Sequence, residues 1–184
     1  MSSMPRSSAA VSGGRPAAAE FWRACSGFRA PGITVVTPGC WITQRSAGCA
    51  GVGIIARVPL ASGLLSGRYS HDTSFDASDH RSYNRHGEAF DVGETFSGVD
   101  FDTGVDAARE FAALAPAGAT PAQTALRWVI QQPGVTTVIP GARNPEQARQ
   151  NSAAAALAPL TAAELRGIED IYDRRIRALV HDRW

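Results

Sequence analysis

Residues 135–151, VTTVIPGARNPEQARQN, combine a strand and a helix start in one short stretch. Val135 to Ile139 are all β-branched, which predicts a buried β-strand. Pro140-Gly141 ends this strand, because neither residue continues a regular element easily. Asn144 is a favourable N-cap, and Pro145 suits the first position of a helix. The sequence therefore predicts a short turn that leads from the end of a strand into a new helix.

The start of this helix is a candidate anion site. Gln147 stands where a capping box has its second member, so the helix is expected to begin at a defined residue. Its first free N–H groups and the positive end of its dipole meet at the helix N-terminus, and Arg143 places a guanidinium close to the same point. A phosphate is the anion that suits such a site best. This is the strongest functional signal in the sequence.

Length and charge limit the class of ligand. The 184 residues suit one domain, or one domain and a tail, and 44% hydrophobic residues is the composition of a globular chain. A net charge of +1 gives no broad basic face for nucleic acid, and no apolar run approaches the length of a membrane span. We therefore expect a small-molecule ligand and neither a nucleic-acid nor a membrane partner. Because no secretory signal is visible, we expect a cytoplasmic location.

Several chemistries are excluded because the residues that they need are absent or have the wrong spacing. All 18 basic residues are arginine, so the chain has no P-loop lysine and no Schiff-base lysine. Cys25, Cys40 and Cys49 lack C-x-x-C spacing and are predicted to be free thiols in a reducing compartment. The histidines of residues 71–101 stand among acidic residues, but their spacing fits no metal-ligand pattern. We predict no metal site.

The first 50 residues differ from all that follow. Their charged residues are five arginines against Glu20 alone, and Ser, Ala, Gly and Pro dominate. Only residues 33–37 resemble a strand. This composition favours a disordered or unrelated segment, with a transit peptide and an irregular loop packed on the rest as alternatives. We therefore divide the chain into an atypical segment, 1–50, and a folded part, 51–184.

The folded part alternates strands and helices. VGIIARV at 52–58 predicts a second buried strand, and the polar residues 71–101 predict a long solvated loop. Within that loop, Arg81 and Arg85 are candidate ligand contacts. Helices are predicted at 103–115, from the N-cap Thr120 to 132, and from the capping box at Thr161 to 176. Strands joined by helices predict an α/β protein with parallel strands.

Three further patterns receive a structural interpretation. Residues 51–56 match G-x-G-x-x-A, but they precede or lie within a strand and do not open a helix, so we predict no dinucleotide-binding turn there. Trp128 is assigned to the core. The C-terminal arginines are predicted to be solvated charges near a helix C-terminus, and this interpretation is preferred to a binding patch. These arginines are Arg174, Arg175, Arg177 and Arg183.

Four stretches together resemble the C-terminal part of an aldo/keto reductase. They are VGIIARVPLASGLLSGRY, DHRSYNRHGEAFDVGETFSGVDF, TPAQTALRWVIQQPGVTTVIPGARNPEQARQN and LTAAELRGIEDIY. The resemblance covers residues 51–184. It implies an α/β fold of the (β/α)8 TIM-barrel family, here an incomplete barrel that contains the C-terminal strands and helices. Residues 52–58 are similar to strand seven and residues 135–139 to strand eight.

The resemblance also implies a cofactor and its site. The family reduces aldehydes and ketones, or runs the reverse reaction, by hydride transfer with NADP(H). Its phosphate-binding parts follow strands seven and eight. The positions similar to the loop along the pyrophosphate are Pro59, Leu60, Ala61, Ser62 and Gly63, with Arg68 as a basic contact. The positions similar to those that hold the 2′-phosphate and adenine are Gly141, Arg143, Gln147, Gln150 and Asn151. This site coincides with the anion site predicted from the residues alone.

A catalytic tetrad is implied by the resemblance but has no counterpart in this chain. In the family, a tyrosine, a lysine, an aspartate and a histidine from the N-terminal half of the barrel serve proton transfer to the carbonyl. Here lysine is absent, and Tyr69, Tyr83 and Tyr172 stand in other segments, so no catalytic residue is assigned. We expect an aldo/keto reductase-like fragment that keeps the NADP(H) cradle and is not a competent reductase by itself. The alternatives are a non-catalytic NADP(H)-binding accessory or interaction module, and an unrelated doubly wound domain.

Overall fold

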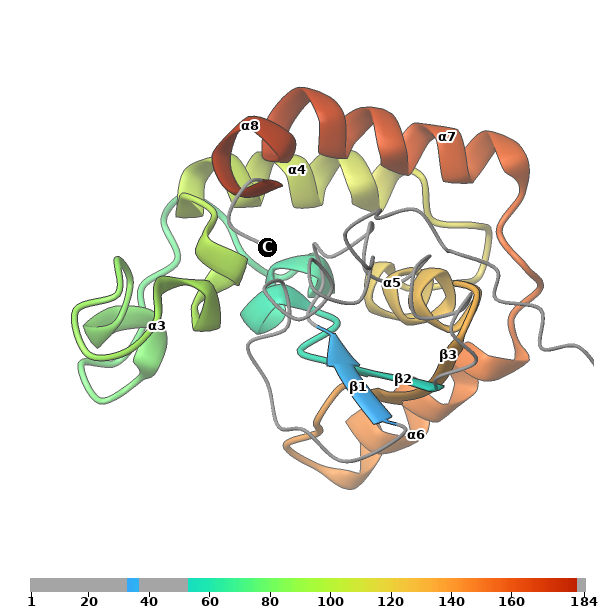
Figure 1. The fold of residues 1–184 in the computed structure, drawn as a ribbon, viewed down its shortest axis with the longest axis horizontal. Helices are drawn as coiled ribbons and strands as arrows, with labels where there is room; N and C mark the ends of the chain where they lie inside the picture. The colour runs from blue at the N-terminus through green and yellow to red at the C-terminus, as the bar shows by residue number, and fades with distance from the viewer. Residues whose placement is uncertain (1–32, 37–52, 182–184) are drawn as a thin grey trace, which may run out of the picture.

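A computed structural model describes residues 33–36 and 53–181 of the chain. Strands β1 (Ile33–Val36), β2 (Gly53–Arg57) and β3 (Val135–Ile139) form a parallel sheet in that order (Figure 1). This arrangement confirms the prediction of parallel strands. It also confirms a strand near residues 33–37. The other expectations for residues 1–50, including the boundary at residue 50, fall on residues outside the described ranges.

Helices connect and flank the strands (Figure 1). The described helices are α3 (His80–Tyr83), α4 (Phe101–Ala113), α5 (Pro121–Ile130), α6 (Pro145–Ala153), α7 (Ala162–Ile171) and α8 (Arg177–Val180). Short 3₁₀ turns lie at Ala61–Ser66, Val92–Glu94, Phe96–Gly98 and Ala154–Ala156. A π-helical turn, Tyr172–Ile176, forms the last part of the helix that the sequence predicts up to residue 176, and α8 continues beyond that prediction. In Figure 1, α7 and α8 lie along α4, while α5 lies nearer the sheet.

The helix starts follow the sequence closely. Thr120 and Thr161 each form the predicted capping box with the residue three positions later. Asn144 caps α6, and Pro145 is the first residue of that helix, as predicted. Helix α4 begins two residues earlier than predicted, because Asp100 caps it by accepting a backbone N–H bond of 3.0 Å. Local spacing therefore determined most of these boundaries.

Strand β2 is the buried centre of the sheet. Ile54 is fully buried and Ala56 is 4% exposed. Gly53 begins the strand, and a Cβ atom there would lie 3.1 Å from the side chain of Thr136 on β3. A tight strand contact, and not a helix, therefore explains this glycine. The prediction that residues 51–56 form no dinucleotide-binding turn agrees with the strand at Gly53–Arg57.

Strand β3 is exposed, although its β-branched residues predict a buried strand. Thr136 and Thr137 are exposed, and 54% of Ile139 is accessible to solvent. Within the described residues β3 pairs only with β2, so it is an edge strand. The prediction of burial was wrong because β-branched residues indicate a strand and not the number of its neighbours.

Residues 71–101 are only in part the solvated loop that their polarity predicts, because most of residues 71–91 are exposed while several aromatic side chains are packed together. The rings of Phe96 and Phe101 lie 5.0 Å apart, and those of Tyr69 and Phe75 lie 5.2 Å apart. Together these four side chains form an aromatic cluster, packed in part against Leu64. The prediction missed this cluster because the aromatic residues are spaced irregularly through a polar segment, so no periodic pattern reveals that they meet.

The C-terminal arginines form ion pairs and are not only solvated. Glu110 of α4 accepts hydrogen bonds from Arg174 at 2.9 Å and from Arg175 at 2.6 Å. These guanidinium groups lower the pKa of Glu110. Arg177 pairs within its own helical segment, and Arg183 lies outside the described residues. The interpretation as solvated charge was incomplete because the partner of Arg174 lies 64 residues earlier in the chain.

His71 makes a pH-dependent contact with α4. Its Nδ1 lies 3.1 Å from Asp102 and its Nε2 lies 3.0 Å from Asp106. The hydrogen bond to Asp102, with a smaller contribution from Asp106, raises the pKa of His71 above its ordinary value of 6.5. The stabilisation is therefore fully present below that value and is lost as the pH rises through the folded-state pKa.

We expect His71→Gln to lower the Tm most near about pH 5, with a difference from wild type that shrinks toward about pH 9. His86→Gln is the control, because the exposed ring of His86 forms no ion pair within the described residues. Thermal melts at several pH values measure both differences. A Tm loss for His71→Gln that is equal at low and high pH would contradict the assignment.

Candidate functional site

Two loops leave the sheet side by side at the carboxyl ends of β2 and β3. Arg57 and Ile139 are partners in the parallel register, and Pro59 and Gly141 each follow two residues later. Adjacent strands lie about 4.8 Å apart, so the two loops begin next to one another. Ligands of parallel α/β sheets bind outside the carboxyl ends of the strands. The predicted site residues therefore lie on two neighbouring loops at the carboxyl edge of the sheet, or on the helical segments that directly follow these loops.

The loop after β2, residues 58–63, has a strained backbone and is called the β2 loop below. The angle φ is +51° at Val58, +46° at Ala61, +55° at Ser62 and +97° at Gly63. Positive φ costs on the order of 1–2 kcal/mol for each residue other than glycine. Such strain persists only where the surrounding structure holds it, and it concentrates at functional sites. The strain supports a functional role for this loop.

Side-chain and carbonyl groups of the β2 loop face protein. The Oγ of Ser62 accepts from the N–H of Phe96 at 3.2 Å, and its carbonyl oxygen accepts from the hydroxyl of Tyr69 at 3.3 Å. Pro59 is fully buried. A Cβ at Gly63 would lie only 2.5 Å from the Tyr69 hydroxyl oxygen, so glycine alone fits there. The loop is thus held against the aromatic cluster.

The head of α6 is open to solvent. All residues from 141 to 146 are exposed, and no described segment covers them. The guanidinium of Arg143 forms no hydrogen bond or ion pair within the described residues, and the same is true of the N–H of Glu146. The next two N–H groups are satisfied, because that of Gln147 donates to the Asn144 side chain at 2.8 Å and that of Ala148 donates to the Asn144 carbonyl at 3.2 Å. The free donors suit a phosphate oxygen.

Gln147 does not complete the capping box predicted for it. Its Oε1 accepts from the N–H of Arg143 at 2.7 Å, one residue before the N-cap. On the other side of the turn, Asn151 donates to the carbonyl oxygen of Gly141 at 2.8 Å. These two bonds fix the backbone of the turn and leave the Arg143 side chain free. The amide nitrogen of Gln147 is also unpaired within the described residues.

Glu146 and Arg149 form an ion pair beside the candidate site that the sequence interpretation did not include. Arg149 donates to the Glu146 carboxylate from Nε at 3.1 Å and from Nη2 at 2.9 Å. Gln150 donates to the same carboxylate at 3.1 Å. An unpaired carboxylate would repel a phosphate at the helix head, and Arg149 offsets this charge. The i, i+3 spacing of these two opposite charges on one helix could have predicted this ion pair from the sequence.

Arg68, Arg81 and Arg85 are the candidate arginine contacts outside the α6 turn, and among these three only Arg68 has no partner within the described residues. Arg68 is exposed and forms no ion pair within the described residues. Arg81 is bound to Asp79, whose pKa it lowers strongly. Arg85 lies over the ring of Phe101, with 4.5 Å between its guanidinium carbon and the ring centre. The structure therefore keeps Arg68 as the candidate contact and gives Arg81 a structural partner.

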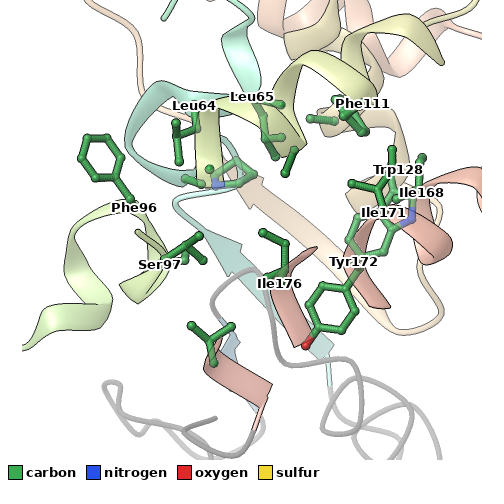
Figure 2. Close-up of a pocket in the computed structure, with 18 of the residues that line it drawn as sticks. Leu64, Leu65, Phe96, Ser97, Phe111, Trp128, Ile168, Ile171, Tyr172 and Ile176 are labelled. Carbon is green, nitrogen blue, oxygen red and sulfur yellow. The ribbon is translucent and has the colours of Figure 1, made fainter. Parts of the chain in front are cut away.

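An apolar cavity of about 170 Å³ lies behind the β2 loop (Figure 2). Leu64, Phe111, Trp128 and Ile168 are among the side chains that line it. Trp128 thus lies in the interior, in agreement with its assignment to the core, although it is only half-buried. The lining is almost entirely hydrocarbon, which suits an apolar group better than a charged one.

The described ranges contain neither a metal-binding cluster nor a helix suited to cross a membrane. Among residues 33–36 and 53–181, no group of three or more His, Cys, Asp or Glu side chains is arranged to hold a metal ion. No helix in those ranges has both the length and the apolar character that a membrane crossing needs.

The family model and the similar solved structures agree on one protein family. The sequence model of the aldo/keto reductase family matches residues 45–173, beginning before the predicted boundary at residue 50. A solved structure of the glycerol dehydrogenase AKR11B4 from Gluconobacter oxydans is 26% identical, with a TM-score of 0.61; the match covers 78% of this chain and 43% of that one. No curated protein matches.

A second solved protein, the aldo-keto reductase AKR11C1 from Bacillus halodurans, is 20% identical. Its apo form gives a TM-score of 0.54 and covers 85% of this chain and 48% of that one. Its holo form gives 0.50, with 74% and 42% covered. The chain therefore spans less than half the length of these solved relatives. The α/β fold of the (β/α)8 barrel kind, present as an incomplete barrel, is confirmed.

Proposed function

Because the chain belongs to the aldo/keto reductase family, we propose that the loops after β2 and β3 bind NADP(H). The pyrophosphate lies along residues 59–63, near Arg68, and the 2′-phosphate lies at Arg143. The observation that carries this proposal is the exposed head of α6, where the Arg143 guanidinium is unpaired within the described residues and the preceding turn begins at the same sheet edge as the β2 loop.

The chemistry of the free groups supports NADP(H) over NAD(H). A guanidinium recognises a phosphate by paired hydrogen bonds, and an arginine is a common partner of the 2′-phosphate. Gln147 keeps its amide nitrogen for adenine, while Gln150 and Asn151 are held against the α6 turn by hydrogen bonds. Gly141 has φ of +68°, which lets the chain turn sharply into the site.

We further propose that this chain does not reduce carbonyl compounds by itself. The family reaction is the NADP(H)-dependent reduction of small aldehydes and ketones, and it requires a lysine that the chain lacks. The hydroxyl of Tyr69 is engaged with Arg81 and the carbonyl of Ser62. A non-catalytic NADP(H)-binding accessory or interaction module is the second candidate. We place either in the cytoplasm, where free thiols persist.

A titration and an assay of the full 184-residue chain test both parts. We expect NADPH to quench or shift tryptophan fluorescence in a saturable way. We expect no NADPH consumption above background with a panel of aldehydes and ketones. Absence of saturable binding would reject the nucleotide site, while turnover that disappears in Arg143→Ala would reject the non-catalytic assignment.

A further inference from the structure

Ser62 of the β2 loop is held from two sides by groups from later in the chain. On one side, its Oγ accepts from the N–H of Phe96 at 3.2 Å and lies 3.5 Å from the carbonyl oxygen of Glu94. On the other side, its own carbonyl oxygen accepts from Tyr69 Oη at 3.3 Å and from Arg81 Nη1 at 3.5 Å. None of these four residues is among the predicted nucleotide contacts of the family pattern.

Arg81 is a rigid member of this arrangement. Its Nε donates to Asp79 at 2.8 Å, its Nη2 donates to the second oxygen of the same carboxylate, and its Nη1 also contacts Tyr69 Oη. The guanidinium lies 4.5 Å from the ring centre of Phe75, and 14% of the side chain is exposed. A lysine could not reproduce this planar, multiply bonded geometry. Arg81 is therefore fixed in place to support Ser62.

Glu94 contacts both the residue that precedes the β2 loop and Ser62 within that loop. Its carboxylate pairs with Arg57, the last residue of β2, while its carbonyl oxygen lies next to Ser62 Oγ. The side chains of Arg57 and Glu94 are 32% and 38% exposed, so the pair is partly shielded from water. Glu94 thus connects the residue that precedes the β2 loop to the residue at its strained centre.

We propose that Arg81 and Glu94 are positioning residues that hold residues 61–63 at positive φ, and so set the affinity for NADPH without touching it. The inference rests on the proposed nucleotide site. Residues other than glycine leave positive φ unless their surroundings hold them. A loop that must be ordered during binding lowers affinity, whereas a loop already held in place avoids that cost.

Arg81→Lys and Glu94→Ala test the proposal in the full chain. We expect each variant to weaken NADPH binding about tenfold, or about 1.4 kcal/mol. Without nucleotide, we expect the N–H of Gly63, which is bound to the carbonyl of Leu60 at 2.9 Å, to exchange about tenfold faster. Asp173→Asn is the matched control, because it breaks an exposed ion pair near α8 and should change neither value.

A rescue variant separates positioning from direct contact. Adding Ala61→Gly to Arg81→Lys should recover part of the lost affinity, because glycine adopts φ of +46° without strain. NADPH binding by Arg81→Lys as tight as wild type would overturn the inference, since a point charge would then suffice. If the wild type binds NADPH but Gly63 exchange is unchanged in both variants, the positioning inference is overturned and the proposed nucleotide site stands. Absence of binding by the wild type would overturn the proposed function as well.

Discussion

Arg143→Ala is expected to weaken NADPH binding about 10- to 100-fold and to change NADH binding less than about twofold. The reason is that hydrogen bonds to a charged group contribute about 1.5–3 kcal/mol, and only NADPH carries the 2′-phosphate. The guanidinium of Arg143 makes no competing contact within the described residues, so its removal should not disturb the fold. Fluorescence titrations with both nucleotides at one fixed salt concentration measure the two ratios.

Arg166→Ala is the matched control for this experiment. Arg166 is an exposed arginine of α7 that forms no ion pair within the described residues. The control should leave both affinities unchanged, which separates a local effect from the loss of one positive charge on the whole chain. An equal loss of NADPH and NADH affinity in Arg143→Ala would remove the 2′-phosphate from the assignment and leave only a general phosphate contact.

Local sequence spacing predicted the helix starts and strands around this site well. The N-cap at Asn144 and the capping boxes at Thr120 and Thr161 were all readable, because each depends on residues within one helical turn. The same holds for strand β2, whose apolar residues are continuous. Positions of loops at the end of parallel strands then follow from the fold class, so the general location of the candidate site was also predictable.

Contacts between distant segments were not predictable in the same way. The bonds from Phe96 and Arg81 to Ser62 join residues whose separation in sequence carries no periodic signal. Gln147 had the correct spacing for its predicted partner, but it bonds to Arg143 because the turn brings that N–H closer. The exposure of β3 depends on how many strands pair with it, and its own residues do not encode that number.

Asn84→Leu is expected to lower the free energy of unfolding by about 3 kcal/mol or more. Asn84 is fully buried, and its Oδ1 accepts from the N–H groups of Ala89 at 2.9 Å and Phe90 at 2.8 Å. Its Nδ2 donates to Thr95 at 3.1 Å. Leucine has the same branched skeleton but would leave two backbone donors unsatisfied, each at a cost of about 1–3 kcal/mol. Urea unfolding of the variant measures the loss.

The same variant should also weaken NADPH binding, because the Asn84 network shapes the segment that presents Glu94 and Phe96 to Ser62. Ser82→Ala is the control, since Ser82 is exposed on the neighbouring helix α3 and should change stability by less than about 0.5 kcal/mol. A loss below about 1 kcal/mol in Asn84→Leu would show that the two amides find other partners. In that case the segment would not depend on Asn84 for its conformation.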